Sequence, residues 1–140
     1  MIIIIVKFIH YLAIVFSGGV LVGSGLIQSV YNKENKVPDI TISKILKILG
    51  FIGLISLIVL WISGIILSNL IYGGFVINSA FTLKLVAAAF LLILSFFLNL
   101  HVYNSSKRNL PPNKKIVKIS TMSARTLIIV VLISAAVAFN

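Results

Sequence analysis

Two ionisable residues near the start of the chain, Lys7 and His10, lie inside a long apolar segment. Because they are three positions apart, a helix places them on one face, a single turn from each other. Ionisable groups at membrane depth are costly and usually mark a functional site. A neutral imidazole is a common metal ligand, so His10 is the first candidate. The alternative is an interhelical hydrogen bond, for instance to Ser63 or Tyr72.

Four glycines follow His10 in the same apolar segment, at Gly18, Gly19, Gly23 and Gly25. Positions without a side chain allow another helix or a flat ligand to approach the backbone closely. The glycines therefore indicate either ordinary helix packing through small residues or the close approach of a ligand.

Lys84 and Trp61 are the candidate residues of the later apolar segments. Lys84 lies one turn into the third segment, where its amine either snorkels to the membrane surface or faces the interior. A deprotonated amine can donate a lone pair to a metal. Trp61 lies well inside the second segment, away from the interface where tryptophans usually gather. It either fills space in the core or contacts a ligand, for which its indole N–H is a donor.

The composition indicates that lipid surrounds most of the protein. The chain is 60% hydrophobic and 10% charged, whereas about a quarter of the residues in soluble domains are charged. Twelve Lys and Arg against two Asp and Glu give a formal net charge of +10. The basic residues lie between apolar segments, which indicates membrane topology and anionic headgroups rather than nucleic acid. The absence of cysteine excludes disulfides and thiolate metal sites.

The apolar segments predict an all-α protein, a single four-helix transmembrane bundle over residues 1–140. The first apolar run continues through Gly25, which is too long for a cleaved signal peptide and favours a spanning helix. The connections are short, as is usual between antiparallel neighbours in a bundle. The predicted helices cover about residues 2–31, 48–70, 81–103 and 122–139.

The distribution of charge predicts the orientation of the bundle. The loops at residues 32–47 and 104–121 fall on the same side of an even number of spans, and they hold nearly all the Lys and Arg. The positive-inside rule places these loops in the cytoplasm and both termini outside. We therefore expect a multi-pass protein of the cell inner (plasma) membrane, with an N-out/C-out topology.

Depth along the helices decides which polar groups can meet. We take Ser17 and Leu92 as the centres of the first and third helices. Along the helix axis, His10 lies about 10 Å before Ser17, and Lys84 lies about 12 Å before Leu92. Both lie towards the outer side, whereas His101 lies about 13 Å towards the cytoplasm. His10 and Lys84 can therefore coordinate one haem iron, whereas His10 and His101 are too far apart to do so. His101 is expected to face headgroups or loop backbone.

The run Lys7-Phe8-Ile9-His10, the glycines that follow and a lysine entering the third span resemble the HemJ-type protoporphyrinogen oxidases. They also resemble the related CopD-like membrane proteins. The resemblance implies haem b held by a first-helix histidine and a third-helix lysine, roles that fall on His10 and Lys84. It also implies an oxidoreductase of the protoporphyrinogen oxidase type. Lys7, one turn from His10, is placed to neutralise a haem propionate.

The chain departs from the HemJ pattern at three places. That family has a tryptophan soon after the histidine and an arginine at the end of the first helix, where this chain has small or apolar residues such as Ser17 and Leu26. The Asn-Glu-x-Pro element that opens its fourth span is replaced here by Ser123-Ala124-Arg125-Thr126. These departures affect the catalytic half of the resemblance more than the haem-binding half.

Two main functions remain open at this stage. The first is an inner-membrane protein that binds haem b through His10 and Lys84, with Lys7 and Trp61 beside it, in electron transfer or porphyrin handling. The second is a structural or accessory subunit of a larger membrane complex without its own cofactor. A transporter ranks lowest, because no Asp or Glu lies within a span. The expected partners are the bilayer, anionic lipids at the basic loops, and either further copies of the chain or other subunits.

Overall fold

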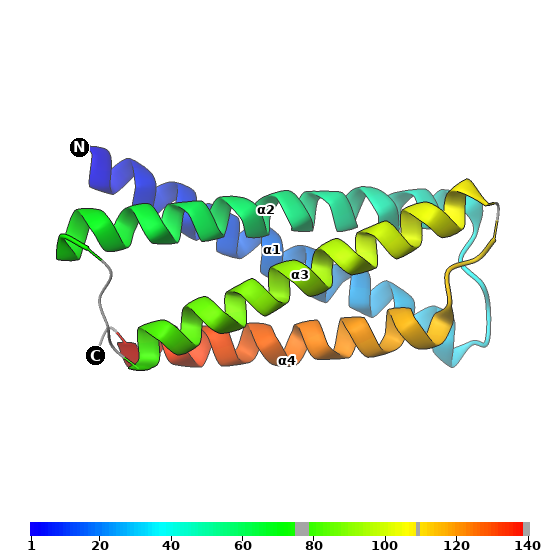
Figure 1. Cartoon of the computed structure of the whole chain (residues 1–140). Coiled ribbons are helices and arrows are strands. Elements are labelled where there is room, and N and C mark those ends of the chain that lie inside the picture. The colour runs from blue at the N-terminus through cyan, green and yellow to red at the C-terminus, as the bar shows by residue number, and fades with distance from the viewer. Residues whose placement is uncertain (75–78, 109, 139–140) are drawn as a thin grey trace.

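The computed structural model describes residues 1–74, 79–108 and 110–138, except for the side chains of residues 79–81, 132 and 134–138. Over these residues the chain forms four α-helices and no strand (Figure 1). This confirms the all-α, four-helix fold class. The helices are α1 (Ile2–Lys33), α2 (Ile40–Tyr72), α3 (Ser79–Lys107) and α4 (Lys114–Ala138).

Within the described residues, three helical stretches are long and apolar enough to cross a membrane: Ile2–Lys33, Ile40–Tyr72 and Thr82–Lys107. Each is well above the length of about 20 residues that a bilayer core requires. The first turns of α4 carry three lysines, so its apolar character is confined to its later turns. By the length and composition of its helices, the protein is therefore a helical membrane protein.

The helices extend further into the basic segments than the sequence predicted. α2 begins at Ile40 rather than near residue 48, α3 ends at Lys107 rather than near 103, and α4 begins at Lys114 rather than near 122. Hydropathy marks where lipid contact ends, but lysine is a good helix former and lets the helix continue into the headgroup region. The predicted end of the last helix at 139 lies outside the described residues.

The interior of the bundle is small and partly polar, whereas most large apolar side chains face outwards. Bulky residues such as Phe8, Phe51 and Phe90 are exposed. In a soluble protein this pattern would be unfavourable, but lipid is as apolar as leucine, and small residues let membrane helices approach closely. The buried residues are mainly Ala and Ser: Ala13, Ala87, Ala88, Ala124, Ser17, Ser56, Ser63, Ser68 and Ser120.

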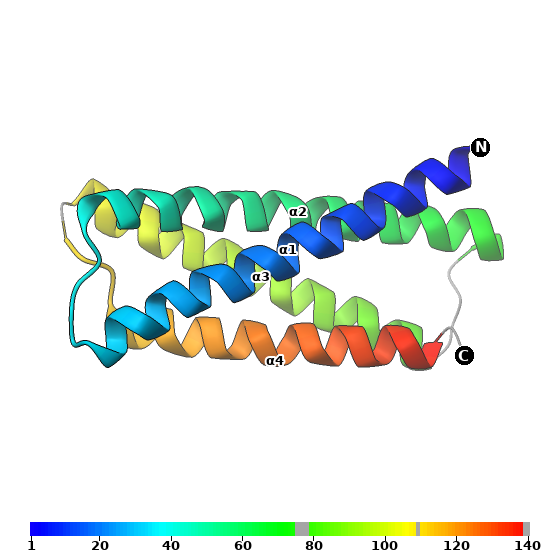
Figure 2. The same cartoon turned by 180° about the vertical axis from the view of Figure 1, so that it is seen from behind.

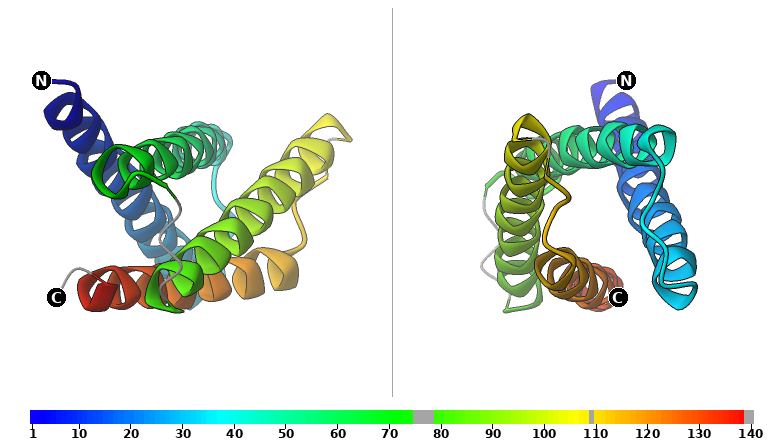
Figure 3. Two further views of the ribbon diagram at one scale, coloured as in Figure 1. Left: turned by 60° about the vertical axis from the view of Figure 1, so that its left-hand side comes forward. Right: turned by 90° about the vertical axis from the view of Figure 1, so that its right-hand side faces the viewer.

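The chain forms two helical hairpins, because α1 packs mainly on α2 and α3 mainly on α4. α2 and α4 run along opposite edges of the bundle, and α1 and α3 cross diagonally between them on opposite faces (Figures 1 and 2). The end-on view on the right of Figure 3 shows α1 and α3 on opposite sides of the interior. A ligand in the interior can therefore be contacted from opposite sides by α1 and α3.

The two ends of the bundle differ in charge. The α1–α2 and α3–α4 connections lie together at one end, which we call the basic end (Figure 1). The start of α1 and the end of α4 lie at the other, which we call the termini end (Figure 2). Successive helices alternate in direction, so both basic loops lie on one side, as the sequence predicted. The assignment of that side to the cytoplasm stays a prediction.

Candidate ligand site between the two hairpins

A cavity of about 90 Å³ lies inside the bundle, towards the termini end, and residues of all four helices line it. Its polar lining comes from His10 and Ser17 of α1, Trp61 of α2 and Lys84 of α3. The rest of the wall is made of Leu, Ile, Val, Ala and Gly side chains. The cavity is therefore an apolar chamber with a few convergent polar groups, as small-molecule sites usually are.

The structure brings His10, Trp61 and Lys84 together at this cavity, although they come from three different helices. Lys7 does not line it, and its side chain is exposed one turn nearer the termini end. His101 lines a separate cavity at the basic end. The sequence predicted that the two histidines lie at different depths, and the structure places them at different cavities.

Helical spacing explains why these residues share one wall. On α1 the lining residues are His10, Ile14, Ser17 and Gly18, which follow one face of a helix, and those on α3 repeat the same pattern. Gly18 leaves open space, since an added Cβ there would meet nothing within 4 Å. The cavity therefore exists partly because α1 carries a glycine where a larger side chain would fill it.

Ser63 of α2 orients the His10 ring. His10 Nδ1 lies 2.9 Å from Ser63 Oγ, and Ser63 Oγ donates its single proton to the Val59 carbonyl at 2.6 Å. With its proton on that carbonyl, Ser63 accepts from His10, and in that arrangement the neutral ring carries its proton on Nδ1. Nε2 then carries a lone pair. Metal-ligating histidines are commonly held this way, with the second ring nitrogen donating to a protein acceptor.

The His10–Ser63 bond is the interhelical hydrogen bond that the sequence offered as the alternative to a ligand role. The bond is made to Ser63 rather than to Tyr72, whose side chain is half exposed. It is made through Nδ1, and in the tautomer that donates to Ser63 the lone pair of Nε2 is left for a ligand. His10 itself is 7% exposed, and Gly64 leaves room for the ring, because a Cβ there would lie 3.5 Å from His10 Cε1.

Trp61 contributes an unsatisfied hydrogen-bond donor. Within the described part of the chain, its indole Nε1 is the buried side-chain polar atom that has no hydrogen-bond partner. A buried donor left without an acceptor costs about 1–3 kcal/mol, and each such group needs an explanation. An acceptor on a bound molecule would provide one, because Trp61 lines the cavity.

Lys84 approaches the same cavity from the opposite side of the bundle. It is close enough to His10 to interact with it electrostatically, although α1 and α3 themselves are not in close backbone contact. An imidazole and an amine are thus presented to one chamber from two hairpins. Both are lone-pair donors in their neutral forms.

Polar groups nearer the basic end join one hairpin to the other directly. Asn99 of α3 donates to the Gly50 carbonyl of α2 at 3.2 Å, and the Lys47 amine of α2 donates to the Ser106 hydroxyl of α3. On the other side of the bundle, the Thr121 hydroxyl of α4 lies 3.5 Å from Gln28 Oε1 of α1. These contacts join the two hairpins directly.

The donor set suits haem iron, but the cavity volume is smaller than a porphyrin needs. The porphyrin supplies four nitrogens, so the protein needs to provide only axial ligands, and one imidazole with one amine is sufficient. No group of three or more His, Cys, Asp or Glu among the described residues could hold a bare metal ion. The enclosed volume of about 90 Å³ is below the 300 Å³ or more of typical ligand sites. A porphyrin would therefore have to separate the hairpins at the termini end.

Comparisons with protein-family models, curated proteins and solved structures find no match to this chain. The functional argument therefore depends on the residues and their geometry.

The sequence analysis missed one group of residues that could have been found. His101, Asn104, Ser105 and Arg108 have the spacing i, i+3, i+4 and i+7, which places four polar side chains on one face of a helix. In the structure these four line a cavity at the basic end. His101 also accepts a hydrogen bond from loop backbone, which agrees with one of its two expected roles.

Proposed function

We propose that this chain is an integral membrane protein that binds haem b between its two hairpins, with His10 and Lys84 as the axial ligands. The observation that carries the proposal is that an imidazole and an amine line one interior cavity from opposite faces of the bundle. The bond from His10 Nδ1 to Ser63 adds support, because it leaves Nε2 for iron.

Two further features support a bound molecule at this position. The indole N–H of Trp61 has no partner among the described residues and lines the cavity. Gly18 leaves part of the wall without a side chain. Lys7 lies one turn outward from His10 and is exposed, so it is available for a propionate at the membrane surface. Bound haem supplies one-electron redox chemistry, and the proposed role is electron transfer or porphyrin handling.

The proposal requires the hairpins to part at the termini end when the porphyrin enters. Two features make this the weaker end of the interface. α1 and α4 make few contacts with each other, and the polar side-chain bonds between the hairpins at Asn99 and Thr121 lie nearer the basic end. The haem would thus enter from the lipid side at the termini end, away from these bonds.

The absorption spectrum of protein purified from haem-replete cells tests this function. We expect a Soret band and the bands of a six-coordinate, low-spin haem in the wild type. His10→Ala and Lys84→Ala should each remove one axial ligand, which abolishes the pigment or converts it to a high-spin form. His101→Ala is the matched control, because it removes the other histidine and should keep the wild-type spectrum. A colourless, iron-free wild-type protein would exclude the function.

We also propose that the protein lies in the cell inner (plasma) membrane. Its basic end then faces the cytoplasm, as the positive-inside rule predicts. Support comes from the two basic loops lying at the same end of the bundle. A reporter enzyme that works only outside the cytoplasm should be active when it is fused after Asn140. Activity of a reporter that works only in the cytoplasm, fused at the same position, would reverse the orientation.

A second candidate function is an accessory subunit of a larger membrane complex, without its own cofactor. The small volume of the cavity, about 90 Å³, favours this candidate. In that case the large apolar side chains on the outside of the bundle would contact other subunits as well as lipid. Mild solubilisation and native gels should then show co-migration with other membrane proteins. A stable monomer or homodimer would count against it.

A further inference from the structure

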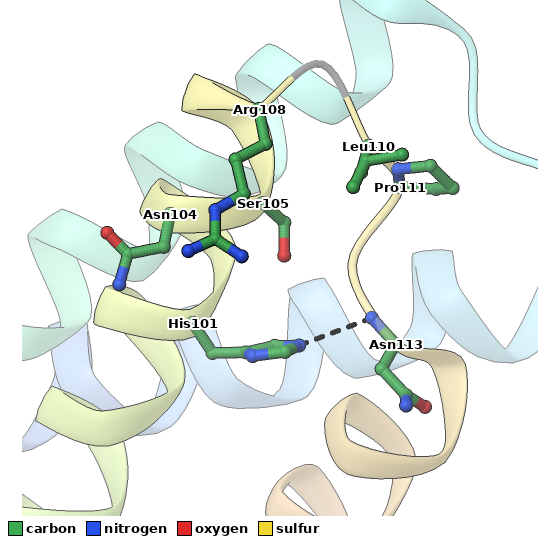
Figure 4. A pocket seen from close by; sticks show the side chains of 7 residues that line it. All are labelled: His101, Asn104, Ser105, Arg108, Leu110, Pro111 and Asn113. Carbon is green, nitrogen blue, oxygen red and sulfur yellow. Dashed lines mark hydrogen bonds between the residues drawn. The ribbon is translucent and has the colours of Figure 1, made fainter.

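A second cavity, of about 490 Å³, opens at the basic end, where α3 ends and the chain turns towards α4. It is independent of the chamber that contains His10, and no function considered so far uses it. His101, Asn104, Ser105 and Arg108 line it from the α3 side, and Asn113 lines it from the α4 side (Figure 4). Arg108 and Asn104 are exposed, so the cavity is open to the aqueous side.

Local hydrogen bonds hold the α3 side of this cavity in place. The Arg108 amide donates to the Asn104 and Ser105 carbonyls, both at 3.2 Å, and the Leu110 amide donates to the Ser105 carbonyl at 3.0 Å. These bonds satisfy carbonyl groups that the end of a helix leaves open. Pro111 follows, and a proline cannot extend the helix because it has no amide proton. The chain therefore leaves α3 at a fixed point and bounds the cavity.

Asn113 holds the α4 side. Its side-chain oxygen accepts from the Lys115 amide at 3.0 Å, and its carbonyl accepts from the Val117 amide at 3.0 Å, which makes it the N-cap of α4. Its own amide donates to His101 Nε2 at 3.2 Å. The His101 ring thus ties the start of α4 to α3, and the walls of the cavity are fixed relative to each other (Figure 4).

The polar lining of the cavity is dominated by donors. Because His101 Nε2 accepts from Asn113, the neutral ring carries its proton on Nδ1 and can donate from there. Arg108 has five N–H donors and no acceptor, and the Ser105 hydroxyl and the Asn104 amide can also donate. Figure 4 shows the Arg108 guanidinium extending towards the His101 ring, with Ser105 beside it. The lining therefore favours an anion.

No carboxylate competes for these donors at the cavity. The chain has two acidic residues, Glu34 and Asp39, and both belong to the α1–α2 connection. Glu34 pairs with Lys36 at 2.8 Å, and neither acid lines the cavity. Lys107 and Lys114 lie next to it in the sequence and add to the positive potential.

We propose that this cavity binds a phosphate group, presented by a lipid headgroup or by a soluble metabolite at the membrane surface. A planar guanidinium matches the oxygens of a phosphate with two parallel hydrogen bonds. His101 and Ser105 line the same cavity and add their donors to those of Arg108. Its position at the basic end places the site at headgroup level, within reach of both sources.

The test compares two variants that lose the same charge. Arg108→Gln removes the guanidinium that lines the cavity but keeps the backbone amide that caps α3. Lys107→Gln is the matched control, because it removes a neighbouring charge that does not line the cavity. The full-length proteins are placed in nanodiscs of neutral phosphatidylcholine and titrated with inorganic phosphate by calorimetry. In a second arm, nanodiscs that also contain phosphatidic acid are analysed by native mass spectrometry, and bound lipids are counted.

Wild-type protein should bind in at least one arm, and the arm identifies the source of the phosphate. Arg108→Gln should weaken binding about tenfold or more, the effect of losing a charge-assisted hydrogen bond, while Lys107→Gln changes it far less. His101→Gln provides a second check on a different wall. If Arg108→Gln and Lys107→Gln lose the same amount of phosphate affinity, surface charge alone accounts for the binding and the proposal is overturned. Absence of wild-type binding in both arms would also overturn it.

Discussion

The two ends of the interface between the hairpins contain similar polar residues and use them in different ways. Near the basic end, Asn99 bonds directly to the Gly50 backbone across α2 and α3, and Thr121 approaches Gln28 across α1 and α4. Towards the termini end, His10, Trp61 and Lys84 surround a cavity instead. Polar groups near the basic end join the two hairpins directly, whereas those towards the termini end line the cavity between the hairpins, and His10 bonds within its own hairpin.

Glycine shows the same difference. A Cβ at Gly50 would lie 2.9 Å from Asn99 Oδ1, and one at Gly25 would overlap the Arg125 guanidinium, so these glycines admit side chains from other helices. A Cβ at Gly18 would meet nothing within 4 Å, although Gly18 lines the cavity. Gly25 and Gly50 thus serve helix packing. Gly18, beside the chamber, leaves space for a ligand.

The largest expected effect is on haem content in Gly18→Leu. The new side chain would project into the cavity that the proposal assigns to the porphyrin, so the Soret absorbance should be lost, as for a ligand excluded by a filled pocket. Gly19→Leu is the control, because Gly19 also has open space but does not line the cavity. Equal haem content in the two variants would place the haem elsewhere.

Ser63→Ala should have an intermediate effect. Loss of the acceptor for His10 Nδ1 leaves the ring free to turn, and the loss of such supporting groups typically lowers metal affinity about 10- to 100-fold. Titration of the apoprotein with haemin measures this change. Ser56→Ala is the matched control, since Ser56 is also buried on α2 but donates only within its own helix, to the Ile52 carbonyl at 2.8 Å. Unchanged affinity in Ser63→Ala would remove Ser63 from the site.

The smallest effect is expected for Asn99→Leu, near the basic end. An interhelical hydrogen bond in a membrane protein contributes about 0.6 kcal/mol on average and up to about 1.7 kcal/mol. The variant should therefore lose about that much stability in an unfolding titration, with haem content unchanged. Phe96→Leu, at an exposed position on the same helix, provides the baseline for a lipid-facing change. A large fall in haem content in Asn99→Leu would show that the two ends are not independent.

The sequence was sufficient to predict the fold class and to place His10 and Lys84 at a similar depth, where both line one cavity. Long apolar runs determine the helices, and the rise per residue places both side chains at one depth. The helix ends were wrong by several residues at Ile40 and Lys114, because lysines end the lipid contact without ending the helix. Ser63 was one of two partners considered for His10, since depth alone does not distinguish the faces of a helix.

The cavities could not be predicted from the sequence. Their volumes depend on how far the helices diverge, and that angle follows from packing between residues distant in the chain. The site at the basic end was missed for a different reason. The spacing of His101, Asn104, Ser105 and Arg108 indicates one polar helix face, but such a face usually contacts only solvent, and Asn113 closes it from the next helix.

The Lys84→His variant tests most directly whether positions 10 and 84 share one iron. An imidazole at position 84 can replace the amine as an axial ligand, so we expect haem to be retained with the absorption and electron paramagnetic resonance spectra of two imidazole ligands. These spectra should differ from those of the wild type and from those of Lys84→Ala. A Lys84→His protein that lacks haem, or that keeps a haem spectrum identical to the wild type, would contradict the proposed site.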